Sequence, residues 1–303
     1  MDGILVVDKP PSKTSHDIVD IVRKATSIKK VGHTGTLDPM ATGVLVVIIG
    51  RAARIGRFLE LEPKEYLAEA VFGMVTDTQD ITGKVLKKDN GKIALENLKA
   101  VISEFTGEIY QVPPMVSAIK IGGKPLYKLA RQGKEIERPE RKVSIYELDI
   151  LSFFESEGRS HVTFKVVCSG GTYIRTLIHD IGERLGVGAT LSSLRRMRVG
   201  RFTLAEAIGA GDATNRPKVA SHLIGVDDAL SQLTEAVVQN NAVGLILNGH
   251  EIGGSQLETI QEPAKPGDYV RIKSKDKTLL AIGQILDKDG LRIKPKVVFK
   301  EAK

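Results

Sequence analysis

Asp38 is the residue of this chain whose type and setting best suit chemistry, because it is a carboxylate displayed in a polar loop. The loop covers residues 32–43, contains three glycines and precedes the apolar run 44–49. Glycine permits close backbone approach, and Pro39 keeps Asp38 out of the α region. Taken alone, the segment favours a plainer role, since the Asp of an Asp-Pro step usually caps a turn.

Arg175 is the charged group that could orient such a carboxylate. It follows the turn Ser169-Gly170-Gly171-Thr172 and lies in the first turn of a predicted helix. An exposed pair of Asp38 and Arg175 would contribute little, whereas a partly buried pair would hold the carboxylate ionised and aimed.

Other kinds of catalytic site lack their usual patterns in this sequence. The six histidines show no zinc-helix spacing, and there is no Gly-x-Ser-x-Gly nucleophile elbow. The loop 32–43 lacks the Gly-Lys-Ser/Thr ending of a phosphate-binding loop. A metallohydrolase is therefore not expected, and the usual nucleotide-binding loop is missing.

Strand and helix patterns alternate around these residues. Strands are predicted where β-branched or alternating apolar residues dominate, at 4–7, 44–49, 66–72, 143–154 and 161–168. Helices are predicted from apolar stripes at 18–25, 51–61, 95–105 and 173–185. Thr14 and Asp17 have the spacing of a capping box, and Gly107 is expected at the C-cap of the third helix.

The last seventy residues differ in character and predict a small β-rich module. Their patterns indicate a helix at 237–247 and strands at 269–273, 279–286 and 291–299. We place the boundary near Thr234, which gives domains 1–234 and 235–303. Residues 265–303 carry +6 of the net charge of +7, which suits docking to a polyanion. A lysine-rich solubilising surface explains the charge equally well.

Composition indicates an ordinary globular protein of 303 residues, 42% of them hydrophobic, with a large core. The single cysteine, Cys168, rules out an intramolecular disulfide framework and is typical of a reducing compartment. We expect a cytoplasmic protein, because the sequence shows no signal-peptide pattern at its start and no apolar run long enough for a membrane span.

Five segments of the sequence together resemble the TruB-type tRNA pseudouridine synthases of bacteria. The loop Gly-His-Thr-Gly-Thr-Leu-Asp-Pro-Met-Ala-Thr-Gly resembles their catalytic motif, with Asp38 in seventh place. The other segments agree in order and spacing: Asp8-Lys9-Pro10 with 14–17, Lys64-Glu65-Tyr66 with 76–80, 111–127, and 168–175 with 193–196. One departure is Ser12, which stands where the family usually has glycine.

The resemblance implies a fold and a reaction. The fold is α+β, the pseudouridine synthase fold, with a mixed, mainly antiparallel central sheet flanked by helices and a C-terminal PUA-like RNA-binding domain. The implied reaction isomerises uridine 55 in the T loop of tRNA to pseudouridine without cofactor or metal. It must break the N1–C1′ bond, turn the base and rejoin it through C5. Three roles stay open for Asp38: attack on the sugar, attack on the base, or abstraction of a ribose proton.

The resemblance also assigns roles to other residues. Arg175 pairs with Asp38, Tyr66 stacks on the target base and assists proton removal, and Tyr173 and Leu194 line the base pocket. His33 occupies the space that the extruded base vacates. Without the motifs, core packing is the preferred role for Tyr66 and Leu194, and loop stabilisation explains His33 equally well.

The expected partner is tRNA, held at its T arm by the catalytic domain and at its acceptor side by the C-terminal domain. Candidates for contact with the RNA backbone are Arg195, Arg196, Arg198 and Arg201. We expect a monomer that binds no membrane and needs no obligatory protein partner, with a secondary role in tRNA folding. The segment 119–143 is expected either to close over the substrate or to form a rigid charged surface. Two alternatives are an RNA-binding or RNA-folding protein with vestigial catalytic residues and a synthase acting on other RNA.

Overall fold

The computed structural model describes residues 1–303 except 118, 127–128, 130–131, 134–135, 288–290 and 300–303. Contacts divide the chain into two compact units. The larger unit contains residues 5–50 and 56–222, and the smaller one contains residues 1–4, 51–55 and 223–303. The boundary expected near Thr234 falls inside the smaller unit.

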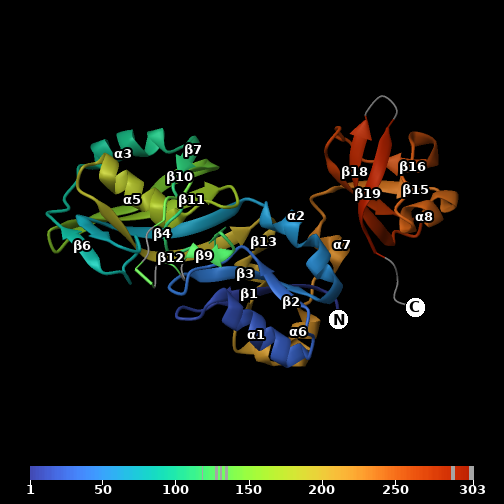
Figure 1. Cartoon of the computed structure of the whole chain (residues 1–303), viewed down its shortest axis with the longest axis horizontal. Helices are drawn as coiled ribbons and strands as arrows, with labels where there is room; N and C mark the ends of the chain where they lie inside the picture. The colour runs from blue at the N-terminus through green and yellow to red at the C-terminus, as the bar shows by residue number, and fades with distance from the viewer. Residues whose placement is uncertain (118, 127–128, 130–131, 134–135, 288–290, 300–303) are drawn as a thin grey trace. The chain divides into compact units, whose positions relative to one another are not determined.

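A large mixed sheet forms the centre of the larger unit (Figure 1). Among the described residues its main path is β14-β1-β3-β12-β4-β11-β10-β7, with β2 paired to β3 and β13 to β12. The strands are β1 (Gly3–Lys9), β2 (Val31–Thr34), β3 (Thr42–Ile49), β4 (Lys64–Phe72), β7 (Gly107–Gln111), β10 (Arg141–Ser156), β11 (Arg159–Cys168), β12 (Ala189–Val199), β13 (Phe202–Thr203) and β14 (Ile208–Gly209). β12 pairs in parallel with β3 and antiparallel with β4, so it joins the two halves of the sheet.

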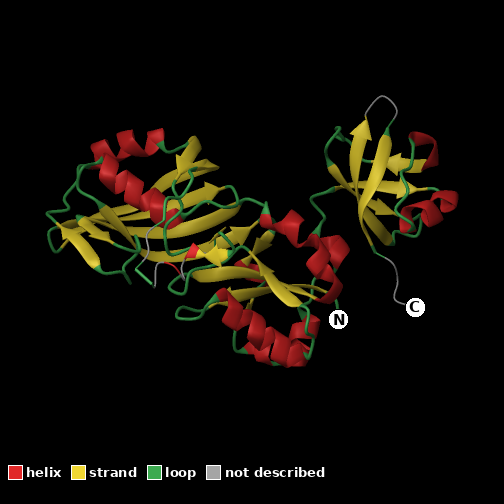
Figure 2. Cartoon of the chain, in the orientation of Figure 1, coloured by secondary structure: helices red, strands yellow, loops and turns green. Residues whose placement is uncertain are grey.

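Helices cover this sheet (Figure 2). α5 (Ile174–Arg184) packs against β12 and β4, and α3 (Leu95–Glu104) packs against α5 and β10. At the other end of the sheet α1 (Ser15–Thr26) contacts β2 and α6 (Arg216–Ser221). The shorter elements of this unit are α2 (Gly56–Glu60), β5 (Met74–Thr76), β6 (Val85–Lys88), β8 (Lys120–Ile121) and β9 (Lys124–Pro125).

The smaller unit is built on a second sheet with the order β16-β15-β17-β18-β19 among the described residues. Its elements are α7 (Val226–Ala229), β15 (Thr234–Val238), α8 (Asn240–Leu247), β16 (Leu257–Ile260), β17 (Tyr269–Lys273), β18 (Leu279–Asp287) and β19 (Arg292–Val298). One apolar cluster, with Ala242 and Ile246 of α8 and Val270 of β17, forms its core. The α+β class, the mainly antiparallel central sheet and the C-terminal β-rich domain are therefore confirmed.

Most of the predicted elements are present at the expected places. Thr14 caps α1 in a complete capping box with Asp17, and β3 is buried along nearly its whole length. The hairpin β10–β11 turns at Glu157 and Gly158, whose φ values of 50° and 74° suit a type I′ turn.

Four details of the sequence prediction were wrong. Val237 and Val238 belong to β15, so the helix starts only at Asn240. α3 ends at Glu104, and Gly107, with φ +97°, opens β7 instead of capping the helix. The segment 51–61 begins as a 3-10 helix over Gly50–Ile55, and part of the loop 32–43 forms β2. No prediction covered β12, the strand that carries Leu194 and three of the candidate arginines.

Candidate active site

Asp38 and Arg175 form a bidentate pair in the larger unit. Arg175 Nε lies 2.9 Å from Asp38 Oδ2, and Arg175 Nη2 donates to Asp38 Oδ1 at 3.1 Å. The Arg175 side chain is 3% exposed and the Asp38 side chain 32%, so the carboxylate faces outward while its cation is enclosed. The structure thus brings together the two charged residues that the sequence singled out, in the partly buried form that orients a carboxylate.

Arg175 is itself fixed by other segments. Its Nη1 donates to the carbonyl of Thr78 at 2.9 Å and its Nη2 to the carbonyl of Val116 at 2.7 Å. The carboxylate of Asp80, 6% exposed, lies 3.5 Å from Nη1. Every nitrogen of the guanidinium therefore has an acceptor or a counter-charge close by, and the group has one orientation only.

Sequence reasoning gave no role to Asp80. Its Oδ1 accepts hydrogen bonds from Thr78 Oγ1, Thr82 Oγ1 and the Thr82 amide at 2.6 to 3.0 Å. These bonds aim the other carboxylate oxygen at Arg175. The only sequence signal was its place at the end of the motif 76–80, which does not reveal what it faces.

The charge state of Asp38 is set by opposing influences. Burial raises the pKa of its carboxyl, the Arg175 guanidinium lowers it, and the charge of Asp80 raises it again, with a net rise above the ordinary value of 3.8. Asp38 is therefore more basic than an exposed aspartate. Greater basicity suits a carboxylate that must react with an electrophile or accept a proton.

Side chains from the N-terminal motif hold the backbone on both sides of Asp38. Ser15 Oγ accepts from the Leu37 amide at 2.9 Å and donates to the Leu37 carbonyl at 3.2 Å. Lys9 Nζ donates to the Pro39 carbonyl at 3.3 Å, and the Ser12 amide donates to the same carbonyl at 2.8 Å. The loop is thus clamped one residue before and one residue after the carboxylate.

Lys9 is fully buried, which is rare for a lysine. Its Nζ also donates to the carbonyls of Pro10 and Lys13 at 3.0 and 2.6 Å. Burial lowers its pKa to about 8 against the opposing charge of Asp38. Its three carbonyl partners indicate a structural role in tying the first loop to the Asp38 loop.

Two glycines of the Asp38 loop differ in their surroundings. Gly43 has φ +101°, and a Cβ there would lie 2.1 Å from the carbonyl oxygen of Arg196 on the neighbouring strand. A Cβ on Gly32 would meet open space. Only Gly43 is therefore required by the close approach of β3 and β12.

The predicted base-pocket residues surround the same region. Tyr66 on β4 and Leu194 on β12 are each 6% exposed and belong to one apolar cluster with Leu37. Burial raises the pKa of the Tyr66 hydroxyl. These positions suit the lining of a base pocket and equally suit core packing, as the sequence had left open.

Tyr173 is held through its backbone at the start of α5. The side-chain amide of Gln111, itself buried, accepts from the Tyr173 N–H at 3.0 Å and donates to the Tyr173 carbonyl at 3.2 Å. The Gln111 side chain thereby makes the two hydrogen bonds that a neighbouring strand would make. It fixes the backbone two positions before Arg175. Its place in the motif 111–127 was noted from the sequence, but its function was not.

His33 lies on β2 opposite Val47. Its Nδ1 is buried and has no hydrogen-bond partner among the described residues. Burial lowers the pKa of the ring, and the charge of Arg196 lowers it further, so a neutral imidazole is favoured. A neutral ring at this position of the Asp38 loop is compatible with both roles considered for His33, which are occupying the space of the extruded base and stabilising the loop.

The four candidate arginines have different environments. Arg195 pairs with Asp8 at 2.8 Å, Arg198 with Glu65 at 3.2 Å and Arg201 with Glu206 at 3.6 Å, and the side chains are 38%, 35% and 37% exposed. Each of these three keeps about a third of its side chain exposed beside a carboxylate that offsets part of its charge. Arg196 does not fit the prediction of an RNA contact, because it is 1% exposed and points into the protein.

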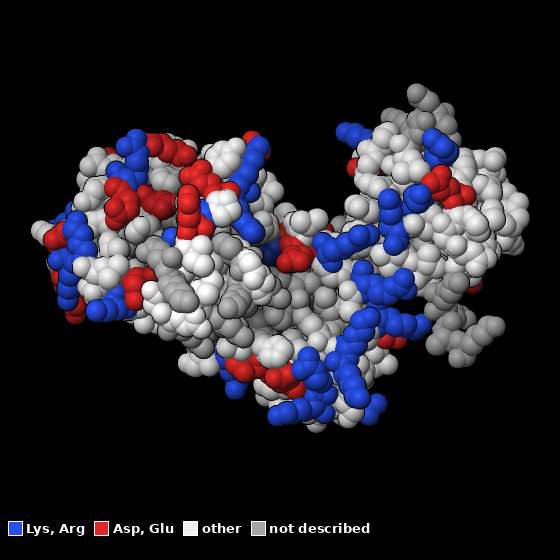
Figure 3. All heavy atoms as spheres, in the orientation of Figure 1, with Lys and Arg blue, Asp and Glu red and all other residues white. Residues whose placement is uncertain are grey.

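The basic charge of the smaller unit is also partly balanced. Lys273 Nζ lies 2.5 Å from Asp227 and 3.0 Å from Glu235, and Lys294 lies 3.1 Å from Glu251. On the face seen in Figure 3, basic and acidic side chains of this unit stand side by side. Only part of the formal charge is therefore available to a polyanion.

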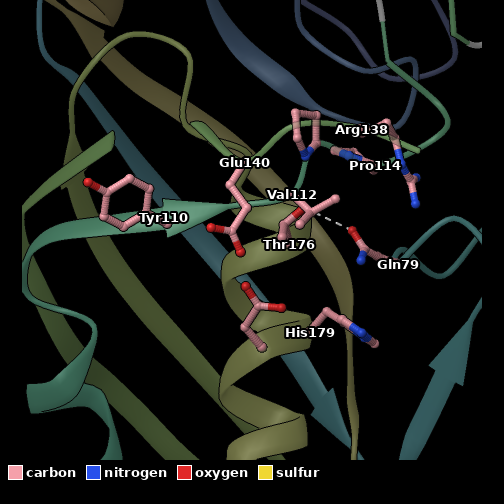
Figure 4. Close-up of a pocket in the computed structure, with 10 residues that line it drawn as sticks. Gln79, Tyr110, Val112, Pro114, Arg138, Glu140, Thr176 and His179 are labelled. Carbon is pink, nitrogen blue, oxygen red and sulfur yellow. Dashed lines mark hydrogen bonds between the residues drawn. The ribbon is translucent and has the colours of Figure 1, made fainter. Parts of the chain in front are cut away.

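A pocket of about 330 Å³ is lined in part by Thr176, His179 and Asp180 of α5 (Figure 4). Thr176, next to Arg175, donates to Gln79 at 3.0 Å across it. Burial and the nearby charge of Glu183 raise the pKa of Asp180, on its wall, to about 6. The segment 119–143, which supplies Arg138 and Glu140 to the lining, lies partly outside the described residues.

Two further features of the described residues concern metal binding and membrane insertion. No group of three His, Cys, Asp or Glu side chains is placed to share a metal ion there. Within the same part of the chain, no helix is long and apolar enough to cross a membrane.

Comparisons with known proteins agree with this fold and site. The family model described as TruB family pseudouridylate synthase (N terminal domain) matches residues 23–174, and that of the tRNA pseudouridylate synthase B C-terminal domain matches residues 175–216. Relatives include tRNA pseudouridine synthase B of Alkaliphilus oremlandii, 46% identical over 87% of each chain. That of Clostridium tetani is 42% identical over 97% of this chain and 98% of its own.

Solved structures give the same result. The chain resembles a protein in a Cbf5-Nop10-Gar1 complex with a TM-score of 0.76 and 29% identity, covering 98% of this chain and 85% of that one. A chain of an H/ACA RNP bound to a substrate RNA containing 2′-deoxyuridine gives a TM-score of 0.74 and 27% identity, with the same coverage. Fold, site and likeness together define a pseudouridine synthase, an isomerase that converts uridine in RNA to pseudouridine. Within that class the chain belongs to the TruB family of pseudouridylate synthases.

Proposed function

We propose that this protein isomerises uridine 55 in the T loop of tRNA, with Asp38 as its essential carboxylate. The observation that carries the proposal is the bidentate pair of Asp38 and Arg175 in a TruB-family chain. The names of the relatives from Alkaliphilus oremlandii and Clostridium tetani support tRNA as the substrate.

The reaction places clear demands on the site. The N1–C1′ bond of the nucleotide breaks, a C5–C1′ bond forms, the C5 proton leaves and N1 gains a proton, so nothing is oxidised or reduced. A carboxylate next to C1′ can attack the sugar or stabilise positive charge there, as in glycoside cleavage. Asp38, exposed on one side and held by Arg175 on the other, meets this demand.

The target base must leave the T loop before it can reach Asp38. Extrusion costs a few kcal/mol, which pocket contacts and phosphate binding must recover. We assign the flat apolar contacts to Tyr66, Tyr173 and Leu194, the vacated space to His33, and proton removal at C5 to the Tyr66 hydroxyl. Arg195, Arg198 and Arg201 are the backbone contacts in this proposal.

The smaller unit is proposed to hold the acceptor side of tRNA in the manner of a PUA domain, and the protein to act as a monomer. Its exposed lysines, such as Lys265 and Lys296, are the candidates for phosphate contact. Replacing both by Gln is expected to weaken tRNA binding and reduce its salt dependence while turnover at saturating tRNA stays the same. Unchanged affinity would contradict the docking role.

The decisive experiment measures tritium release from an unmodified tRNA transcript labelled at C5 of uridine. The unaltered protein is expected to release tritium, Asp38→Asn to release none, and both to bind the transcript. A transcript with cytidine at position 55 tests the site, because it should abolish release. Full activity of Asp38→Asn would refute the role of the carboxylate.

A further inference from the structure

Arg196 is a buried cation that the proposed chemistry does not yet use. It is among the largest fully buried side chains of the protein. Its Nε donates to the carbonyl of Val44 at 2.7 Å and its Nη2 to the carbonyl of Gly35 at 3.0 Å. No carboxylate of the described residues pairs with it, so its charge is balanced by neutral groups alone. Burying such a charge costs free energy, so a buried, unpaired arginine indicates a role in function.

The partner of Arg196 across the sheet is Tyr66. The two residues face each other in the antiparallel register of β12 and β4, so their side chains lie on one face. The charge of the Arg196 guanidinium acts on the Tyr66 hydroxyl and lowers its pKa against the rise caused by burial. Arg196 is therefore paired across the sheet with the residue assigned to proton removal, and its side chain binds the loop that carries Asp38.

Arg196 holds this loop at both of its ends. The guanidinium binds the carbonyl of Gly35, three residues before Asp38, and that of Val44, where β3 has begun. The Arg196 backbone also lies against Gly43 in the parallel pairing of β12 and β3. A shift of the guanidinium would consequently move Asp38 and Tyr66 relative to each other.

The charge of Arg196 also acts on its neighbours. Burial is the main cause that lowers the pKa of Lys64 to about 8, and Arg196 is the next. Arg196 likewise opposes the burial-driven rise of the Tyr66 pKa. The phenol thus has positive charge beside it, which stabilises negative charge that develops there during proton transfer.

We propose that Arg196 is a positioning residue of the isomerisation, which fixes the Asp38 loop to the strand that pairs with Tyr66 and supplies positive charge on the same face as the phenol. It does so without touching RNA, because it is buried. The inference deepens the proposed function and rests on it for the choice of substrate.

The test compares Arg196→Met, which removes the charge and the hydrogen bonds, with Arg196→Lys, which keeps the charge. Turnover at saturating tRNA transcript and the dissociation constant for the transcript are measured separately. Arg196→Met is expected to lose about 100-fold in turnover with a dissociation constant within about twofold of the unaltered protein. Arg196→Lys is expected to be about tenfold slower than the unaltered protein, because it keeps the charge but loses the fixed geometry of the guanidinium.

Lys64→Met is the matched control. Lys64 is a buried cation on β4 whose Nζ donates to the carbonyls of Glu60 and Glu62 at 2.7 and 2.9 Å. Its loss is expected to lower the thermal stability of the protein but to leave turnover within a few-fold. A loss of turnover in Lys64→Met as large as in Arg196→Met would show a merely structural effect.

Other outcomes also decide the matter. A folded Arg196→Met with turnover within about threefold of the unaltered protein would overturn the inference, as would a loss confined to RNA affinity. If Arg196→Met does not fold, a folded Arg196→Lys that is fully active overturns it and one that is about tenfold slower supports it. Inactivity of the unaltered protein on the transcript would instead contradict the tRNA substrate, and total cellular RNA would then serve in the same comparison.

Discussion

Asp38 and Arg175 are 137 positions apart in the chain and meet through two contacts of 2.9 and 3.1 Å. The Asp38 side chain keeps about a third of its surface exposed, while Arg175 is enclosed by carbonyl groups and Asp80. The carboxylate can therefore meet a substrate without giving up its counter-charge.

Arg175→Gln is expected to lower turnover by about 100-fold or more, because it removes the groups that aim Asp38. It should also raise the pKa of Asp38, since the guanidinium lowers that pKa. If Asp38 must be ionised, activity falls as the pH drops through its pKa, so the acid limb of the pH–rate profile should move to higher pH. The measurement is residual turnover between pH 4 and pH 8, with Arg184→Gln on the exposed end of α5 as the control.

Asp80→Asn is expected to move the same acid limb in the opposite direction. The charge of Asp80 raises the pKa of Asp38, so its removal lowers that pKa and extends activity to lower pH. Turnover near neutral pH should also fall, because Asp80 helps to orient Arg175. A shift of the limb to higher pH would contradict this account of the charges.

Ser12→Gly is expected to stabilise the protein. Ser12 has φ +63°, a conformation that costs a non-glycine residue about 1–2 kcal/mol, whereas the greater chain entropy of glycine costs about 0.5–1 kcal/mol. The free energy of unfolding in urea should rise by about 0.5–1 kcal/mol. Ser103→Gly in α3 provides the contrast, since the same substitution in an ordinary helical position should lower it.

Asp180→Asn is expected to stabilise the protein increasingly as the pH rises from about 4 to above 6. The folded-state pKa of Asp180 is raised from 3.8 to about 6, so its contribution to stability is fully present below pH 3.8 and is lost as the pH rises through about 6. After allowance for solvent screening, we expect a gain of about 1 kcal/mol in the free energy of unfolding at pH 8 relative to pH 5. An equal effect of the variant at both pH values would show that burial does not perturb this carboxyl.

Local patterns were sufficient to predict much of the fold. The capping box of α1, the buried strand β3 and the hairpin β10–β11 each depend on residues close together in sequence. The helix that carries Arg175 follows from its apolar stripe in the same way. The family resemblance supplied the pairing of Arg175 with Asp38, which local reasoning had only allowed.

The parts that were missed depend on distant neighbours. β12 carries several arginines, so its sequence does not read as a buried strand, and only its pairing with β3 and β4 encloses Arg196. Asp80 faces Arg175 because of hydrogen bonds with Thr78 and Thr82, which no spacing rule predicts. Val237 and Val238 lie next to an apolar helix in sequence, and their place in β15 is set by its pairing with β17 and β16.

The glycines of the Asp38 loop look equivalent in the sequence, yet they differ in how strictly the structure requires glycine. Gly43 has no room for a methyl group against Arg196, whereas Gly32 has open space and an ordinary backbone conformation. In a saturation library selected for activity, position 43 should accept glycine alone, while position 32 should accept small side chains. Mutational tolerance at this motif thus measures how closely two strands approach, rather than how flexible the loop is.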